Sequence, residues 1–229
     1  MQRKIVWSLF DSETATVSKS LKDCDVYSFG IGSGTGHIHL DLSDFATAKK
    51  ELDKYPRPDF LFASPPCETW CFISVGSKRF FTSELGINLY WRKKWVPFDF
   101  LPKHFDRRMN GMKTAETLVN IIRCYTPEYW AIENGARSLI FDYLREICHL
   151  YGFKNLTNYY SYGFDYLKPT VIYSNSKLFL KRNSPTRELS KVADSIKNYS
   201  KSDMARYRSR VPESLYLDIF SQFNRGLFL

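Results

Sequence analysis

Cys67 is the residue in this sequence whose type and setting best suit covalent chemistry. It follows an apolar run at residues 59–63 and the segment Ser64-Pro65-Pro66. Prolines cannot continue a central strand, so the strand must end there and the thiol is held at a fixed place beyond it. A thiolate can attack a ring carbon and later leave it. We predict that Cys67 is a nucleophile, and an ordinary buried cysteine after a proline turn is the alternative.

Glu133 and Asn134 end a second apolar run, at residues 129–132. A carboxyl group at the end of a buried strand is partly desolvated, which favours its protonated form and lets it donate a proton at neutral pH. Asn134 can orient that carboxyl group or bind the edge of a substrate. An alternative explains Glu133 and Asn134 about equally well: they are the polar end of a strand, and Asn134 and Gly135 form a turn there.

Lys168 lies in a third segment, residues 162–173, where aromatic residues flank a loop next to a strand. This position suits contact with a phosphate or a base, and it equally suits a solvated hairpin. We expect all three segments to meet at the carboxyl edge of a parallel sheet, because open α/β sheets bind their ligands there.

Apolar runs alternate with helical patterns along the chain, which predicts βαβ units around a parallel sheet. Strands are expected at residues 4–10, 26–31, 37–42, 59–63, 129–132, 154–161 and 170–174, the last two as an antiparallel pair. Helices are expected at residues 14–21, 44–54, 113–125, 138–150 and 212–223. We predict a single domain over residues 1–229, with an aromatic and basic insertion at about 71–112 and a basic loop at about 181–203.

In this order, the three segments resemble the cytosine-C5 DNA methyltransferase family, particularly its short phage-type members. Ser64-Pro65-Pro66-Cys67 is similar to the family's Pro-Pro-Cys motif, and Ile132-Glu133-Asn134 to its Glu-Asn-Val motif, with Gly135 in place of Val. Tyr166-Leu167-Lys168-Pro169-Thr170 falls where the family has Gln-x-Arg-x-Arg, and there only Lys168 keeps a positive charge. The resemblance implies a Rossmann-like methyltransferase fold, with a mostly parallel sheet, helices on both faces and an antiparallel C-terminal strand.

The resemblance also implies a reaction and a role for each residue. Cys67 would attack C6 of a cytosine flipped out of its stack. Glu133, held by Asn134, would contact and protonate N3, and Lys168 would contact the base or its phosphate. C5 would then take a methyl group from S-adenosylmethionine.

The family's cofactor motifs are matched only in part. Phe10-Asp11-Ser12-Glu13-Thr14 stands where the family has Phe-x-Gly-x-Gly, and the Cβ atoms at 12 and 14 narrow the approach of a ligand. No acidic residue ends the second strand, whereas Asp41 matches the acid that contacts the adenine amino group. The S-adenosylmethionine contacts that the resemblance implies are Phe10, Asp11, Thr14, Asp41, Leu42, Ser64 and Pro65.

An excess of positive charge favours a polyanionic partner. The chain has 33 Lys and Arg against 24 Asp and Glu, a formal net charge of +9. In the insertion, cations alternate with aromatic rings, as in surfaces that bind phosphates and unstacked bases, although a lid with its rings packed inward gives the same pattern. The predicted nucleic-acid contacts are Lys78, Arg79, Arg92, Lys93, Lys94, Arg107, Arg108 and Arg137. DNA is the predicted substrate, RNA stays open, and a partner subunit is a possible source of target recognition.

The remaining signals exclude several classes of protein. Cys67, Cys71 and His104 lack the spacing and the fourth ligand of a zinc site, so no metal is predicted. No apolar run approaches the ~18 residues of a membrane span, and the N-terminal run is too short for a signal peptide. We expect a cytoplasmic protein with reduced thiols.

A second hypothesis follows from the missing glycines and the missing acid at the end of the second strand. On this view the chain has the same fold but little or no turnover, and binds DNA or a host protein in an anti-restriction or anti-defence role.

Overall fold

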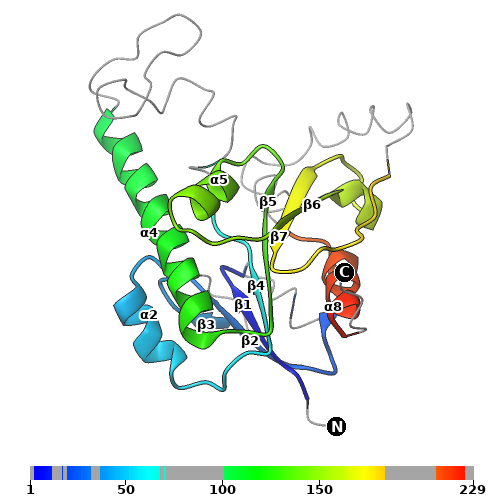
Figure 1. Cartoon of the computed structure of the whole chain (residues 1–229), viewed down its shortest axis with the longest axis horizontal. Coiled ribbons are helices and arrows are strands. Elements are labelled where there is room, and N and C mark those ends of the chain that lie inside the picture. The colour runs from blue at the N-terminus through cyan, green and yellow to red at the C-terminus, as the bar shows by residue number, and fades with distance from the viewer. Residues whose placement is uncertain are drawn as a thin grey trace, which may run out of the picture.

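The described part of the chain is built on a seven-stranded sheet with the order β3-β2-β1-β4-β5-β7-β6 (Figure 1). The structure is a computed structural model and describes residues 3–11, 17, 20–31, 37–67, 70, 101–183 and 210–224. Its strands are β1 (Ile5–Leu9), β2 (Asp25–Gly30), β3 (His37–His39), β4 (Phe60–Ala63), β5 (Tyr129–Gly135), β6 (Phe153–Asn158) and β7 (Pro169–Ser174).

Strands β1 to β5 run parallel to their neighbours, and β7 is antiparallel to both β5 and β6. From β1 the chain moves outward through β2 to β3, and then returns to place β4 on the other side of β1. The strand order therefore reverses between β1 and β4. In open α/β sheets, ligands bind beyond the carboxyl ends of the strands at such a reversal.

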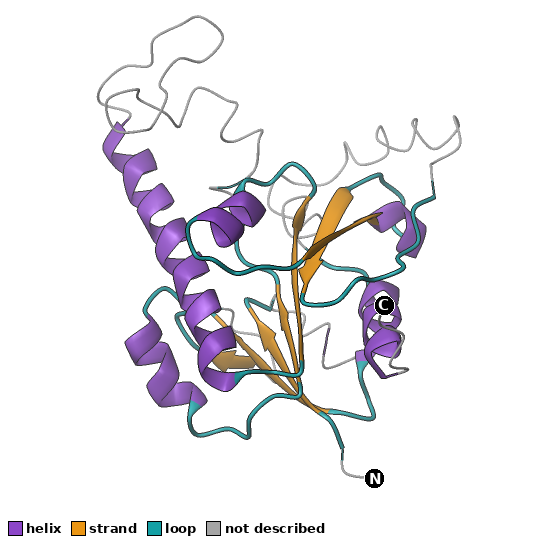
Figure 2. Cartoon of the chain, in the orientation of Figure 1, coloured by secondary structure: helices purple, strands orange, loops and turns teal. Residues whose placement is uncertain are grey.

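Helices cover both faces of this sheet (Figure 2). Helices α2 (Phe45–Leu52), α4 (Leu101–Tyr125) and α5 (Ile140–Glu146) lie on one face, and α8 (Glu213–Asn224) lies on the other with the 3-10 turn η2 (Tyr159–Tyr162). The predicted fold class is confirmed in its architecture: a Rossmann-like α/β fold with a mostly parallel sheet, helices on both faces and an antiparallel C-terminal strand.

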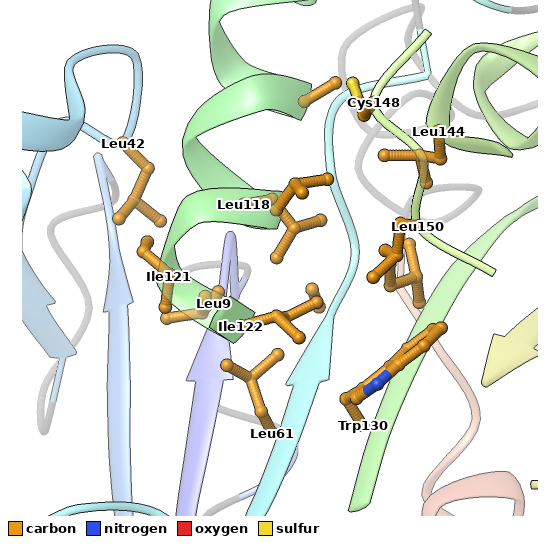
Figure 3. Packing of buried hydrophobic residues seen from close by; sticks show 14 of the residues in the cluster. Leu9, Leu42, Leu61, Leu118, Ile121, Ile122, Trp130, Leu144, Cys148 and Leu150 are labelled. Atoms are coloured by element: carbon orange, nitrogen blue, oxygen red, sulfur yellow. The ribbon is translucent and has the colours of Figure 1, made fainter. Parts of the chain in front are cut away.

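The larger core lies between the sheet and α4. Leu118, Ile121 and Ile122 of α4 contact the apolar side chains of β1, β4 and β5, among them Leu9 and Leu61 (Figure 3). Fully burying one such side chain stabilises the fold by roughly 1.5–3 kcal/mol. This packing fixes the three strand ends from which the candidate site is built.

The second core lies between the sheet and α8. Tyr216 meets Phe62 of β4 edge-on, with ring centroids 4.5 Å apart, and Phe223 stacks on Tyr129 at 4.6 Å. The hydroxyl of Tyr162 in η2 donates to the carboxylate of Asp218 at 2.6 Å. Helix α8 therefore holds η2 against the same face of the sheet.

The predicted start of the long helix at residue 113 is wrong, because α4 begins at Leu101. Pro102 is compatible with the first turn of a helix, where its missing N–H has no intrahelical partner anyway. The polar residues that follow give no apolar stripe, so the pattern could not reveal this half of the helix. Residues 101–112 of the predicted insertion are thus helical, and residues 71–100 lie outside the described part.

Other boundaries also differ from the prediction, and β3 ends at His39 instead of residue 42. Strand β5 continues past 132 to Gly135, and helix α5 spans only Ile140–Glu146 of the predicted 138–150. Strand β6 ends at Asn158 instead of 161, because the Asn158 side chain accepts a hydrogen bond from the Ser161 N–H and begins η2. Among the described helices, none combines the length and apolar character needed to cross a bilayer.

Candidate active site

Cys67 lies in the loop that leaves the carboxyl end of β4, as predicted from the two prolines. The backbone N–H of Ser64 donates to the carbonyl oxygen of Leu9 at 3.1 Å, so the loop begins as a continuation of the sheet. Pro65 is buried, whereas Cys67 is exposed and forms no disulfide. The thiol therefore sits at the accessible carboxyl edge, next to the reversal of strand order.

Trp70 anchors the chain just after this thiol. Its backbone N–H donates to the Cys67 carbonyl oxygen at 3.1 Å, and its own carbonyl oxygen accepts from Leu139 at 3.0 Å. The indole is buried against Tyr143 of α5, and the guanidinium of Arg108 lies 4.0 Å from its ring centroid. The sequence analysis missed Trp70, for which a large aromatic three residues after the thiol was the available signal.

Glu133 lies at the end of β5, beside the loop that carries Cys67. It is 4% exposed, and both carboxylate oxygens accept hydrogen bonds. Oε2 accepts from the Ser64 hydroxyl at 2.7 Å, and Oε1 accepts from the Tyr159 hydroxyl at 2.7 Å. The ammonium group of Lys168 lies 3.5 Å from Oε1. Three side chains that come from three separate parts of the chain therefore converge on the Glu133 carboxylate.

Asn134 faces the opposite side of the sheet from Glu133, because successive side chains of a strand alternate. Its amide donates to the carbonyl oxygen of Pro65 at 2.9 Å, and its side-chain oxygen accepts from the Gly135 N–H at 3.0 Å. The expectation that Asn134 holds the Glu133 carboxyl group is therefore wrong in its geometry. Asn134 holds the loop that carries Cys67.

Tyr159 is a part of this cluster that the sequence analysis missed. Its side chain is fully buried, and burial, followed by the charge of Glu133, raises the pKa of its hydroxyl well above the usual range. Lys168 lies over its ring, with Nζ 4.1 Å from the centroid. Tyr159 falls within the predicted strand at 154–161, where nothing in the alternation distinguished it from its aromatic neighbours.

Asp11 and Phe10 occupy the turn after β1. Phe10 has φ 58°, a left-handed conformation that residues other than glycine rarely adopt. The buried carboxylate of Asp11 accepts a hydrogen bond from the Ser28 hydroxyl of β2 at 2.9 Å. A left-handed residue and a side-chain hydrogen bond thus shape the chain directly after β1, where the family that the sequence resembles has glycines. Thr14 lies outside the described residues.

The residues that follow β3 include the other groups expected to meet a cofactor. Asp41 is exposed, and its carboxylate accepts from the Ser43 N–H at 2.9 Å. The side chain of Leu42 is buried in the larger core (Figure 3), and its expected contact with the cofactor stays a prediction. Within the described part of the chain, both ring nitrogens of His37 are buried without a hydrogen-bond partner.

These groups fit the adenosine part of S-adenosylmethionine. A carboxylate such as Asp41 can accept a hydrogen bond from an amino group, and the half-buried ring of Phe10 offers an apolar face. A neutral imidazole has one donor and one acceptor, which the hydroxyls of a ribose can satisfy. The sequence analysis missed His37, since a histidine on a short strand is usually structural.

The structure places the predicted nucleic-acid contacts in different surroundings. Arg108 is half-buried over Trp70, and burial lowers the pKa of its guanidinium. Arg137 is exposed and borders a hollow of about 370 Å³ that is also lined by Asp142 and Lys154. Arg107 lies in α4. Lys78, Arg79, Arg92, Lys93 and Lys94 lie outside the described residues.

The fold and the site define an α/β protein with a thiol and a buried carboxylate at the carboxyl edge of a Rossmann-like sheet, and with a cation, that of Lys168, beside the carboxylate. Neither a protein-family model nor a curated protein sequence matches the chain. Similar solved structures include a protein described as a DNA modification methyltransferase encoded within a prophage of E. coli, at 12% identity and a TM-score of 0.41. The S. pombe Dnmt2 methyltransferase is another, at 14% identity and a TM-score of 0.43. The matches cover 75% and 87% of this chain but only 46% and 56% of those structures, so the chain spans about half their length.

Proposed function

We propose that this protein is a cytosine-C5 DNA methyltransferase that acts through a covalent adduct on Cys67. One relationship supports the proposal above all others. The thiol and the carboxylate of Glu133 follow the adjacent parallel strands β4 and β5, and two hydrogen bonds join their segments, Ser64 to Glu133 and Asn134 to Pro65.

In the proposed reaction, the Cys67 thiolate forms a bond to C6 of the cytosine. The electron pair of the C5–C6 double bond shifts toward C4, the C4–N3 pair moves onto N3, and N3 takes a proton from Glu133. C5 would then form its bond to the methyl carbon as the bond from that carbon to the sulfur of S-adenosylmethionine breaks, which would leave S-adenosylhomocysteine. Water takes the proton from C5, the C5–C6 double bond re-forms as the bond between C6 and the Cys67 sulfur breaks, and N3 returns its proton to Glu133.

The surrounding residues position the two reacting side chains. Ser64 and Lys168 fix the orientation of the Glu133 carboxyl group, and Asn134 fixes the loop that carries Cys67. The ammonium group of Lys168 also stabilises negative charge that develops on the base, since electrostatic effects are strong in a site of low exposure. Arg137, exposed beside the end of β5, would contact a phosphate of the nucleic acid.

S-adenosylmethionine supplies an electrophilic methyl group when it is bound. Phe10 after β1, His37 at the start of β3 and Asp41 after β3 would hold its adenosine part. Ser64 and Pro65 are committed to Glu133 and Asn134, so their role is to assemble the site. The buried carboxylate of Asp11 stabilises the turn beneath the cofactor through Ser28.

The test is methyl transfer and adduct formation by the full chain. Tritiated S-adenosylmethionine would be incubated with DNA of varied sequence, and in parallel with RNA, which separates the two substrates. DNA that contains 5-fluorocytosine should trap a covalent complex with the wild-type chain and none with Cys67→Ala. Cys124→Ala, which removes a half-buried thiol elsewhere, is the matched control and should trap as wild type does.

Absence of both methyl transfer and adduct with every nucleic acid would overturn the proposal. Tight DNA binding without transfer would instead support the second hypothesis, a binding protein on the same fold.

A further inference from the structure

We propose that Tyr159 is a positioning residue that fixes Glu133 and Lys168 as one unit, an inference that rests on the proposed function and deepens it. Its hydroxyl donates to Oε1 of Glu133 at 2.7 Å, the same oxygen that lies 3.5 Å from the ammonium group of Lys168. Tyr159 is fully buried and does not reach a substrate. It acts on the reaction through the other two side chains.

Tyr159 holds Lys168 as well as Glu133. The ammonium group lies 4.1 Å from the centroid of the ring, within the range of a cation–π contact. The backbone N–H of Tyr159 donates to the carbonyl oxygen of Lys168 at 3.1 Å, which fixes the start of β7 against η2. One residue therefore sets both the backbone and the ammonium group of Lys168.

The hydroxyl of Tyr159 is a permanent donor. Burial and the neighbouring carboxylate raise its pKa well above the usual range for tyrosine, so it keeps its proton throughout the pH range of an enzyme assay. With Ser64 on the other oxygen, each oxygen of Glu133 has a hydroxyl donor. These fixed donors leave the carboxyl group one orientation, toward the loop that carries Cys67.

Local structure explains why Tyr159 points into the site. The Asn158 side chain accepts from both the N–H and the hydroxyl of Ser161, which converts the end of β6 into η2. Phe164 packs edge-on against the Tyr159 ring at 5.3 Å and donates its N–H to the Tyr159 carbonyl oxygen. The ring is thus fixed on several sides, as a positioning residue requires.

Tyr159→Phe tests the proposal, and Tyr162→Phe is its matched control. Tyr162 is also buried, lies in the same turn, and donates its hydroxyl to a carboxylate, that of Asp218 at 2.6 Å. Each variant loses one hydroxyl that donates to a carboxylate, but only the Tyr159 hydroxyl donates to Glu133. We expect Tyr159→Phe to lower kcat by about 10- to 100-fold with KM for DNA nearly unchanged, and Tyr162→Phe to leave kcat within about 3-fold.

Carbon-13 NMR of the glutamate carboxyl groups tests the contact without any turnover. The Glu133 signal is assigned with Glu133→Gln, and it should shift in Tyr159→Phe and stay in place in Tyr162→Phe. An unmoved Glu133 signal in Tyr159→Phe, or an equal loss of kcat in both variants, would overturn the proposal. A wild-type chain without methyl transfer overturns the proposed function instead, while the NMR result still decides whether Tyr159 holds Glu133.

Discussion

The side-chain amide of Asn134 donates to the carbonyl oxygen of Pro65 at 2.9 Å, and this bond joins the strand that ends in Glu133 to the loop that carries Cys67. Both groups are buried, so the bond forms away from water. The spacing between thiol and carboxylate therefore depends on a residue that takes no part in proton transfer.

Asn134→Ala should slow adduct formation with 5-fluorocytosine DNA by about 10-fold or more, because the Cys67 loop loses its fixed position. The free energy of unfolding should fall by about 1–3 kcal/mol, since the Pro65 carbonyl oxygen and the Gly135 N–H lose their partner. Trapping kinetics and urea denaturation measure the two effects.

Asn175→Ala is the control for this variant. The Asn175 side chain makes the same kind of bridge at the other end of β5, with Glu128 and Trp130. Equal slowing of the adduct in both variants would show that general destabilisation, and not the Cys67 loop, is responsible.

Thiol alkylation should distinguish Cys67 from the buried cysteines. Cys67 is exposed, whereas burial raises the pKa of Cys148 to about 11 and also raises that of Cys24. At pH 8 the Cys148 thiol is almost entirely protonated, and its alkylation should accelerate as the pH rises toward 11. Peptide mapping after brief iodoacetamide treatment measures each rate. Equal rates for Cys67 and Cys148 at pH 8 would show that Cys148 is not buried.

Arg108→Gln should change the stability of the fold, whereas Arg137→Gln should change its affinity for DNA. Loss of the Arg108 guanidinium over Trp70 should lower the free energy of unfolding by about 1 kcal/mol and leave affinity nearly unchanged. Loss of the exposed Arg137 should leave stability unchanged and weaken DNA binding, with a reduced dependence of affinity on salt. Denaturation and fluorescence anisotropy at several salt concentrations test both variants. A larger affinity loss for Arg108→Gln would show that Arg108 leaves Trp70 to contact DNA.

Calorimetry with S-adenosylhomocysteine should locate the adenosine contacts. Asp41→Ala and His37→Phe should each weaken binding by roughly 10-fold, the value of one lost hydrogen bond to a ligand. His39→Phe is the matched control, because His39 lies two residues along the same strand and is exposed. Unchanged affinity in His37→Phe would mean that the unpartnered nitrogens have no part in cofactor binding.

The sequence predicted the sheet well because its strands are short apolar runs bounded by glycine, proline or polar residues. The Pro-Pro pair located Cys67, and the polar end of β5 located Glu133. The partners of Glu133 could not be found this way. Ser64 and Tyr159 reach its carboxylate from the end of β4 and the end of β6, and no local pattern specifies which segments become neighbours.

The role of Asn134 shows where the resemblance to a motif gives the wrong geometry. The motif places Asn134 next to Glu133 in sequence, and the alternation of a strand then places the two side chains on opposite faces.

The antiparallel hairpin at the edge of the sheet affects the order in which heating removes activity and secondary structure. Residues 153–174 form β6, η2 and β7, and β5 is the strand that joins them to the rest of the sheet. Such edge units often open separately from the central strands. Opening would remove Tyr159 and Lys168 together and expose Glu133 to water, while β1, β2, β4 and α4 stay packed. Heat inactivation would then precede the loss of most secondary structure.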